Sequence, residues 1–461
     1  MKKAFSLLLL FISSLSFSQE IAGQWFGTIE IQGTKLNLIF NIRKDSNGYA
    51  ATMDSPEQGV RGIPINTVSF QSPNLKMGIE IAGIEYNGTL KASNEIIGTF
   101  SQGGANFPLN LIQNKDVKKR PQEPTEFNYY VENITFQNKK DNISLGGTLT
   151  LPSKEGKFPV VVLISGSGAQ NRDSELLGHK SFLVIADYLT KRGIGVLRFD
   201  DRGVGESKGD RNIATTKDFA TDVSAAVEYL KTRKEVNIKK IGLIGHSEGG
   251  IIAPMVAANS KDISYIVLLA GTGIPGDELL IQQTYLVGKA AGMSEEELKE
   301  TQADNAKIYD IIKTEKNLET AKQKLTAIIQ ASFDELPADQ KPSQEEINTV
   351  ISQQIGMIAS PWFQYFVTYN PSLILKDVKC PVLVLNGEKD VQVPSKVNTQ
   401  AIKNALEKGG NKKVTVVELP NMNHLFQECV TCSVDEYEKI EQTFSPIALA
   451  QIGDWITNQV K

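Results

Sequence analysis

The chain of 461 residues is long enough for two to four domains, at roughly 100 to 200 residues for each domain. Hydrophobic residues make up 41% and charged residues 22%, close to the average of globular proteins, which excludes a disordered or fibrous chain. Its 49 lysines and arginines stand against 53 aspartates and glutamates, a net charge of -4. This balance lacks the basic excess that nucleic-acid binding needs, so we expect no nucleic-acid partner.

The amino terminus has the three parts of a signal peptide. Met1, Lys2 and Lys3 form a charged start, residues 4–12 are apolar, and residues 13–18 are mostly small, with a cleavage point near Ser18. No later stretch approaches the roughly 20 apolar residues of a membrane span. We therefore predict that residues 1–18 are a signal peptide and that the mature protein is exported, periplasmic or secreted, without a membrane span.

Residues 19–114 form short apolar runs separated by glycine, asparagine and serine. In one run Leu36, Leu38 and Phe40 alternate with polar residues, the period of a half-buried strand. This pattern predicts a small all-β domain, a barrel or sandwich of antiparallel strands. It contains no histidine or cysteine, and its acidic residues form no obvious pair. We expect no catalysis there.

Residues 115–125 are charged and include two prolines, a composition typical of an exposed linker. The pattern changes after it, over residues 126–461. Apolar strand runs alternate there with helical segments such as 182–191 and 219–231; the strand runs are 158–164, 194–199, 241–244, 265–270 and 381–385. Continuous apolar strands alternating with helices predict a mostly parallel sheet with helices on both faces, an α/β domain.

The alternation stops between about residues 273 and 371, where charged helical segments take over. Ser294 with Glu297, and Ser343 with Glu346, have the spacing of a capping box, which marks a helix start. We predict a helical cap inserted over one end of the sheet.

The strongest local motif is Gly-x-Ser-x-Gly, from Gly245 to Gly249, between an apolar strand and a helical run. A serine on such a turn is held in a strained conformation, so glycines are needed where a Cβ would collide with neighbouring backbone. A glycine-rich turn with an ordinary serine is the alternative. The context of strand, turn and helix favours Ser247 as a nucleophile.

A serine nucleophile needs a base, usually a neutral imidazole, and the chain has three histidines. His246 adjoins the serine, so its side chain should point away and pack. His179 starts a predicted helix, which favours a surface or capping role. His424 lies in a loop after the last predicted strand, residues 414–419. Position and elimination favour His424 as the base.

An imidazole base requires a carboxylate behind it, which holds the tautomer and stabilises the cation. Asp390 follows the strand 381–385 and is our candidate, with Glu388 as the second choice. Ser247, Asp390 and His424 then occur in the order nucleophile, acid, base, which is that of α/β-hydrolases and not that of chymotrypsin-like or subtilisin-like proteases.

The tetrahedral intermediate also needs two backbone N–H donors, an oxyanion hole. Glu248 follows the nucleophile and supplies the first. The second is expected in Ser165–Gly168, with Ser167 as the best candidate, although a plain Gly-Ser turn is the alternative. Residues 200–207 are glycine-rich and charged but lack the spacing of a phosphate-binding loop, so we interpret them as a structural loop near the site.

Three cysteines do not make a disulfide scaffold in a chain of this size. Cys380 precedes an apolar strand, where a buried free thiol is expected. Cys429 and Cys432 form a Cys-x-x-Cys without the context of a redox motif, so a local disulfide or two reduced thiols are both favoured over a redox centre.

At this point the chain resembles a known family: serine hydrolases of the α/β-hydrolase fold, specifically EstD-type carboxylesterases, related to serine aminopeptidase-like hydrolases. The resemblance runs from about residue 133 to 455. It rests on six blocks in order: GSGAQNRD (166–173), FDDRGVGES (199–207), GHSEGG (245–250), SPWF (360–363), LNGEKDVQVP (385–394) and NHLFQ (423–427).

The resemblance implies ester hydrolysis through an acyl-serine, with Ser247, Asp390 and His424 at the family's catalytic positions. It also implies that the cap roofs the acyl pocket, where Trp362 and Phe363 line the wall or, equally, belong to the core of the cap. We expect a small-molecule ester as substrate, no cofactor or metal, and no obligate protein partner. Two alternatives stay open: a peptidase or acyl transferase on the same fold, and a binding protein whose hydrolase half is inert.

Overall fold

The computed structural model describes residues 21–31, 34–45, 48–55, 60–92, 94–113, 120–334 and 341–461. The predicted signal peptide lies outside these residues, and so do residues 115–119 of the predicted linker. Contacts within the chain define two compact units that divide after Lys118. Within the described ranges, no helix is long and apolar enough to cross a membrane.

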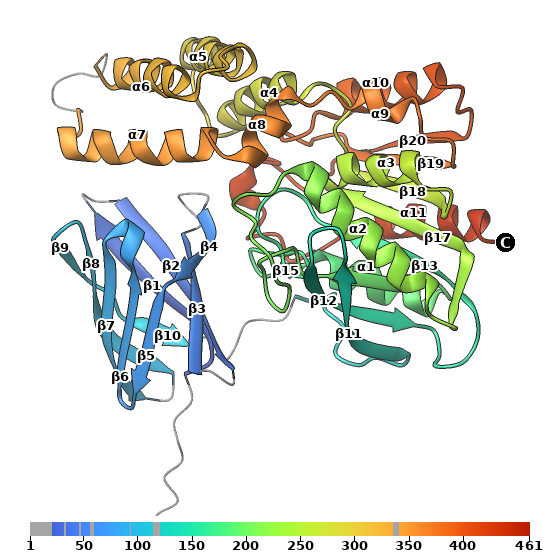
Figure 1. Cartoon of the computed structure of the whole chain (residues 1–461), viewed down its shortest axis with the longest axis horizontal. Coiled ribbons are helices and arrows are strands. Elements are labelled where there is room, and N and C mark those ends of the chain that lie inside the picture. The colour runs from blue at the N-terminus through green and yellow to red at the C-terminus, as the bar shows by residue number, and fades with distance from the viewer. Residues whose placement is uncertain are drawn as a thin grey trace, which may run out of the picture. The chain divides into compact units, whose positions relative to one another are not determined.

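The first unit is an antiparallel sheet of ten strands with an apolar core. Its strands, in blue in Figure 1, are β1 (Gly23–Ile31), β2 (Thr34–Asp45), β3 (Gly48–Ser55), β4 (Val60–Ile65), β5 (Thr67–Gln71), β6 (Asn74–Ile79), β7 (Ile84–Ala92), β8 (Glu95–Gln102), β9 (Ala105–Pro108) and β10 (Leu111–Gln113). They pair in the order β4-β3-β2-β1-β10-β8-β7-β6-β5, and β9 pairs with β8. Every second residue of a strand faces one side, so the alternation seen in β2 buries Leu38 and Phe40 beside Trp25 and Tyr86.

Two residues of the predicted linker, Arg120 and Gln122, belong to the second unit and are bound to its loops. The Arg120 guanidinium donates to the carbonyls of Leu177, Glu438 and Ile440, and the Gln122 amide donates to that of Phe444. This stretch is more ordered than its charged composition indicates, because its long side chains find carbonyl acceptors on a neighbouring loop.

The second unit contains a mixed sheet of eight strands. These are β11 (Tyr130–Asn138), β12 (Ile143–Leu151), β13 (Phe158–Ile164), β16 (Gly195–Phe199), β17 (Val236–His246), β18 (Ile263–Leu269), β19 (Val382–Gly387) and β20 (Val414–Leu419), paired in the order β11-β12-β16-β13-β17-β18-β19-β20. The six strands from β16 to β20 in that order are parallel, whereas β11 and β12 are antiparallel. A separate two-stranded ribbon joins β14 (Glu175–Leu176) to β15 (His179–Lys180).

Helices cover both faces of this sheet, as the continuous apolar strands predict. One face packs against α1 (Ser181–Lys191) and α11 (Pro446–Gln459), and the other against α2 (Thr216–Lys231), α3 (Gly249–Asn259) and α10 (Ser395–Lys408). Alternate residues of one strand therefore enter two separate cores. Val160 and Val162 of β13 face the second group of helices, and Val161 faces the first.

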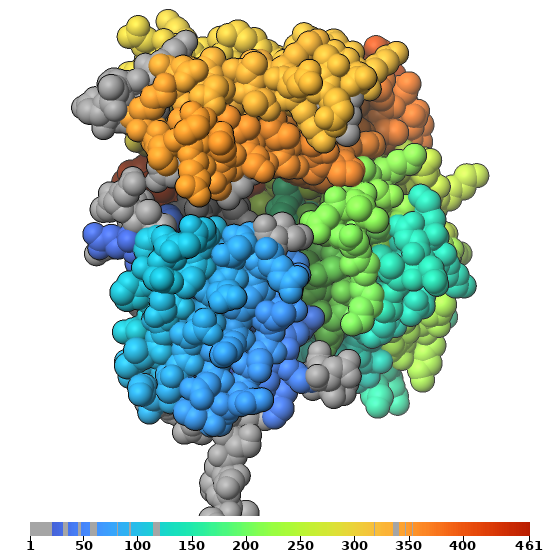
Figure 2. Space-filling view, turned by 60° about the vertical axis from the view of Figure 1, so that its left-hand side comes forward, coloured from blue at the N-terminus to red at the C-terminus, as the bar shows by residue number. Residues whose placement is uncertain are grey.

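The inserted segment between β18 and β19 is helical, with α4 (Gly276–Ala290), α5 (Glu295–Thr314), α6 (Leu318–Asp334), α7 (Gln344–Ile358), α8 (Pro361–Thr368) and α9 (Ser372–Leu375). Helix α5 begins at the capping box that the sequence indicates: Ser294 accepts from the N–H of Glu297, and the Glu297 carboxylate accepts from that of Ser294. A small apolar cluster joins these helices. Figure 2 shows them, in yellow and orange, gathered on one side of the second unit.

The order of the strands decides where a ligand can bind. From β13 the chain crosses to β16 on one side and later to β17 on the other, so the loops that follow β13 and β17 diverge at the carboxyl edge of the sheet. Such a divergence leaves a crevice at that edge. All the site residues predicted from the hydrolase core lie in loops at this edge.

Candidate active site

Ser247 lies on a tight turn between β17 and α3. Its φ of +54° is in the left-handed region, where a non-glycine residue is strained. Two glycines make the turn possible. A Cβ on Gly245 would come within 2.0 Å of the carbonyl oxygen of Gly249, and one on Gly249 within 2.3 Å of that of Ile164. The structure thus confirms the need for both glycines.

Asp390 and His424 come together from the loops that follow β19 and β20. The carboxylate oxygen Oδ2 of Asp390 lies 2.8 Å from Nδ1 of His424, and both side chains are buried. The other oxygen accepts from the N–H groups of Gln392 and Val393, each at 2.8 Å. A carboxylate can only accept, so Nδ1 carries the proton and Nε2 is left as the basic nitrogen.

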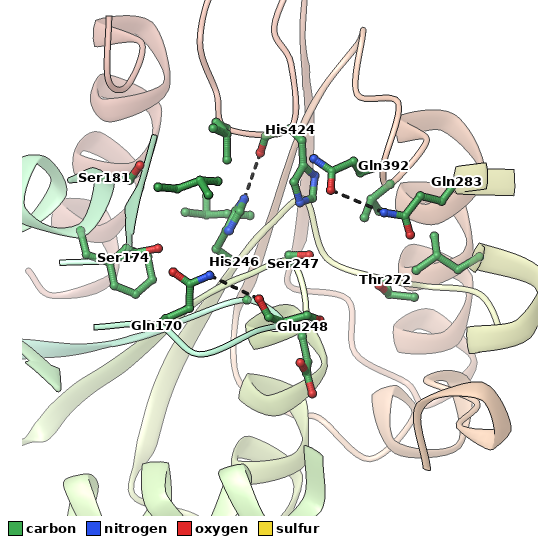
Figure 3. A pocket seen from close by; sticks show the side chains of 18 of the residues that line it. Gln170, Ser174, Ser181, His246, Ser247, Glu248, Thr272, Gln283, Gln392 and His424 are labelled. Atoms are coloured by element: carbon green, nitrogen blue, oxygen red, sulfur yellow. Dashed lines mark hydrogen bonds between the residues drawn. The ribbon is translucent and has the colours of Figure 1, made fainter. Parts of the chain in front are cut away.

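Ser247 and His424 line one cavity of about 330 Å³ at the carboxyl edge of the sheet. Figure 3 shows the His424 ring directed toward Ser247 within it. Glu388, the alternative acid, is exposed and accepts from the N–H of Asn421 instead. The geometry therefore favours Asp390 as the partner of His424.

The two predicted oxyanion donors border the same cavity. Ser167 and Glu248 are among its lining residues, and Gly166 lies so close that a Cβ there would be 3.2 Å from the Cβ of Ser247. Among the hydrogen bonds formed within the described part of the chain, none uses the N–H of Ser167 or of Glu248. Both donors are available to a substrate oxygen.

The side chain of Glu248 connects the core to the inserted helices. Its Oε1 accepts from Nε1 of Trp362 in α8 at 2.8 Å and from the Thr216 hydroxyl at 2.7 Å. Trp362 lines the cavity, which is the first of the two alternatives predicted for it. Phe363 does not share that position: its ring packs in the cluster of inserted helices, with its centroid 6.1 Å from that of Tyr309. For Phe363 the other of the two alternatives holds, the core of the cap, because adjacent residues of a helix point about 100° apart.

Two expectations about the other histidines are also corrected. His179, expected at the surface, is fully buried and lies 2.9 Å from the Tyr437 carbonyl and 3.1 Å from the Thr443 hydroxyl. His246, expected to point away, lines the cavity, and its Nε2 is 2.9 Å from the carbonyl of His424. Burial lowers the pKa of each imidazole to about 4, so both stay neutral near pH 7.

Cys429 and Cys432 form a disulfide in the loop that follows His424, one of the two alternatives for this pair. Cys380 is a free thiol, but it is half-buried and not fully buried as expected. Burial still raises its pKa to about 11, which keeps it protonated.

Polar residues at the cavity were not predicted from the sequence. Gln283 of α4 lies 3.5 Å from Gln392 through their side-chain amides, and Figure 3 shows both beside His424. Ser174 and Ser181 line the opposite side. Gln392 is within one of the six blocks and had a signal of that kind. Gln283 had none, because a glutamine on a polar helix is unremarkable until the fold brings it to the cavity.

Two family models match the second unit. A model described as serine aminopeptidase, S33, matches residues 179–329, and one described as the C-terminal domain of BAAT and acyl-CoA thioester hydrolases matches residues 343–431. Together they include Ser247, Asp390 and His424. The second unit thus resembles hydrolases of the α/β-hydrolase fold, both in its strand-turn-helix around Ser247 and in the two family models that it matches.

The chain is similar to esterase EstD of Thermotoga maritima, with 28% identity over 300 residues, 64% of this chain and 61% of that one. An uncharacterised protein of Pseudomonas aeruginosa is 32% identical over 168 residues, 36% of this chain and 42% of that one. The matches thus span less than two thirds of either relative. A solved structure of a Pyrococcus furiosus esterase aligns with a TM-score of 0.45 and 17% identity, over 73% of this chain and 94% of that one.

Proposed function

We propose that the protein is a serine carboxylesterase in which Ser247, His424 and Asp390 form the catalytic triad. The observation that carries the proposal is the 2.8 Å contact between Asp390 and His424 in a cavity that also contains Ser247. The strained backbone of Ser247 adds to it, since such strain is stored at functional sites.

The proposed reaction has two halves. His424 Nε2 takes the proton of the Ser247 hydroxyl as its oxygen attacks the ester carbonyl, and the N–H groups of Ser167 and Glu248 hold the oxyanion. Collapse breaks the bond to the alcohol, which leaves with that proton. Water then attacks the acyl-serine, with His424 again as base, and releases the acid. Asp390 stabilises the imidazolium in both halves.

The cavity supports small esters as substrates. Ligand pockets are typically about 300 to 1,000 Å³, and this one, at about 330 Å³, is at the lower end. Leu279, Leu280 and Phe366 line it on the side of the inserted helices, together with Trp362. An apolar wall of this kind suits a short acyl chain.

A panel of p-nitrophenyl esters of increasing acyl length, run on the wild type and on Ser247→Ala, tests the proposal. We expect turnover to be highest for short chains and to be lost in the variant, together with labelling by a fluorophosphonate. Wild-type turnover in Ser247→Ala would remove the proposed mechanism.

A serine aminopeptidase is the second candidate, and one observation favours it: a buried carboxylate oxygen that lacks a hydrogen-bond partner. Oε2 of Glu248 is buried beside the nucleophile and has no hydrogen-bond partner in the described part of the chain. The α-ammonium of a peptide would supply such a partner. Faster cleavage of aminoacyl p-nitroanilides with a free α-amine than of matched esters would support this candidate over the esterase.

We also propose that the protein is exported. The charged and apolar segments of residues 1–18 support this, and a disulfide between Cys429 and Cys432 suits an oxidising compartment. The mass of the protein isolated from the periplasm or medium tests it: we expect a chain that starts near Gln19, and a full-length chain retained in the cytoplasm would contradict it.

A further inference from the structure

Asp201, in the loop that follows β16, is a carboxylate that the proposed triad does not use. Its side chain is only 12% exposed, and it forms an ion pair with Arg211, 3.0 Å away. Burial raises the pKa of this carboxyl to about 6, although Arg211 and its hydrogen bonds act in the opposite direction. A carboxylate held in such a place needs partners that repay its desolvation.

Those partners are at both ends of the loop that contains Ser167. The Ser165 hydroxyl donates to Oδ1 of Asp201 at 2.6 Å, and the N–H of Gln170 donates to Oδ2 at 3.0 Å. In return the N–H of Asp201 donates to the Gln170 carbonyl at 3.1 Å. One aspartate therefore fixes the residues on either side of Gly166–Gly168.

The Ser167 peptide is held through the same residue. The side-chain amide of Gln170, whose backbone is bound by Asp201, donates to the Ser167 carbonyl at 3.3 Å. Gly168 has a φ of +93°, so the chain turns sharply just after Ser167. The orientation of the Ser167 N–H thus depends on contacts that start at Asp201.

We infer that Asp201 is a positioning residue for the oxyanion hole: its carboxylate, held by Arg211, clamps Ser165 and Gln170 and so directs the Ser167 N–H at the substrate oxygen. This inference rests on the proposed esterase function. Its neighbour Asp200 has different partners: it accepts from the guanidinium and N–H of Arg172 and from the N–H of Glu206.

Asp201→Asn is the direct test, with ester kinetics as the measurement. An asparagine has one acceptor oxygen, so it cannot accept from Ser165, Gln170 and Arg211 together. A small misplacement of a catalytic donor costs on the order of 100-fold, so we expect kcat to fall about 10- to 100-fold. KM should stay within about twofold, because the donor acts mainly on the transition state. Inhibition by phenylboronic acid, which forms a tetrahedral adduct on the serine, should weaken by a similar factor.

Asp222→Asn is the matched control. Asp222 and Asp201 both border one small cavity of about 20 Å³. Asp222 pairs with Arg202 at 2.7 Å and accepts hydrogen bonds from Arg202 and Asn138, but none from residues 165–170 in the described structure. We expect this variant to lose thermal stability and keep its kcat within about twofold. If Asp201→Asn behaves in the same way, Asp201 is merely structural and the inference is wrong.

Ser165→Ala decides the question if Asp201→Asn does not fold. It removes the hydroxyl that donates to the Asp201 carboxylate, so we expect kcat to fall about 3- to 10-fold without a change of KM, because one of the hydrogen bonds that hold the Ser167 loop is lost. Ser165→Thr, which keeps a hydroxyl, should recover most of it; an unchanged kcat in Ser165→Ala overturns the inference. Wild-type turnover in Ser247→Ala would overturn both the proposed esterase function and this inference. Turnover that depends on Ser247 but is unchanged by the Asp201 and Ser165 substitutions would overturn the inference alone.

Discussion

The two units of the chain differ in what they bury. In the described part of the first unit, the buried polar side chains are Ser55 and Gln113, around a core of Trp25, Phe40 and Tyr86. The second unit buries charged and ionisable groups near the carboxyl edge of its sheet, among them Asp200, Arg202, Asp222, Glu248, Asp390 and His424.

This difference shows that the second unit, and not the first, bears the free-energy cost of burying charged groups. A buried charge costs free energy unless it is paired and hydrogen-bonded, so a fold keeps one only with partners that hold it in place. In the second unit two of these groups, Glu248 and His424, line the same cavity as Ser247. The first unit has an apolar core, which is typical of a domain that carries no catalytic residues. If the contrast holds, variants around Ser247 in the second unit should change activity, and variants in the first unit should change stability alone.

Asp390→Asn should have the largest effect, a fall in kcat of about 10⁴-fold, because the amide stabilises the wrong tautomer of His424 and cannot stabilise its cation. Ester hydrolysis measures it. Glu388→Gln is the control, since Glu388 is exposed and bonds only to a backbone N–H in the described structure. Equal losses in the two variants would contradict the assignment of the acid.

Trp25→Ala should destabilise the first unit by about 3 to 5 kcal/mol, the usual cost of removing a large buried aromatic side chain. Trp25 is fully buried, and its indole N–H donates to the Ile21 carbonyl at 2.8 Å. Urea denaturation followed by circular dichroism measures the loss. We expect kcat/KM to stay within about twofold of wild type. A parallel loss of activity would show that the two units are not independent. Leu197→Ala, at a buried position of the second unit, is the comparison, because there we expect stability and activity to fall together.

Trp362→Phe should lower kcat/KM about tenfold on the best ester of the panel, since it removes one of the two donors to Oε1 of Glu248 and leaves that of Thr216, a loss of roughly 1 to 3 kcal/mol. The ester panel also shows whether the preferred acyl length shifts. Phe363→Leu is the matched control from the next position of α8: we expect a lower melting temperature and an unchanged panel. The same kinetic loss in both variants would mean that cap stability, and not the indole contact, is responsible.

His179→Gln should change the pH dependence of stability and little else. The pKa of His179 is lowered to about 4 in the folded protein, from about 6.5 when unfolded. Between these values the unfolded state binds a proton that the folded state does not, so stability falls as the pH falls from 6.5 toward 4. Glutamine cannot titrate, so the variant's melting temperature should decline less over this window. An unchanged slope would contradict the neutral, buried state of this imidazole.

Much of the site could be predicted from the chain because its chemistry depends on local sequence. Gly245 and Gly249 indicate the tight turn that carries Ser247, since each is needed where a Cβ would meet backbone. Few alternatives existed for the base, with three histidines in all. His179 was predicted wrongly, Gln283 was missed, and the role of Phe363 stayed open between pocket wall and cap core. The rotation of a helix, burial by a distant loop and placement at a cavity leave no mark in a short stretch of sequence.

The amino-acid sequence by itself determined the α/β alternation, the all-β character of the first unit and the identity of the triad candidates, because each follows from a local period or from a motif of a few residues. Only the tertiary structure decided which carboxylate meets His424, which aromatic residue of α8 faces the cavity, and that Asp201 holds both ends of the Ser167 loop. These contacts join residues that are tens to hundreds of positions apart. The register of the parallel strands brings them together, and no local pattern encodes that register.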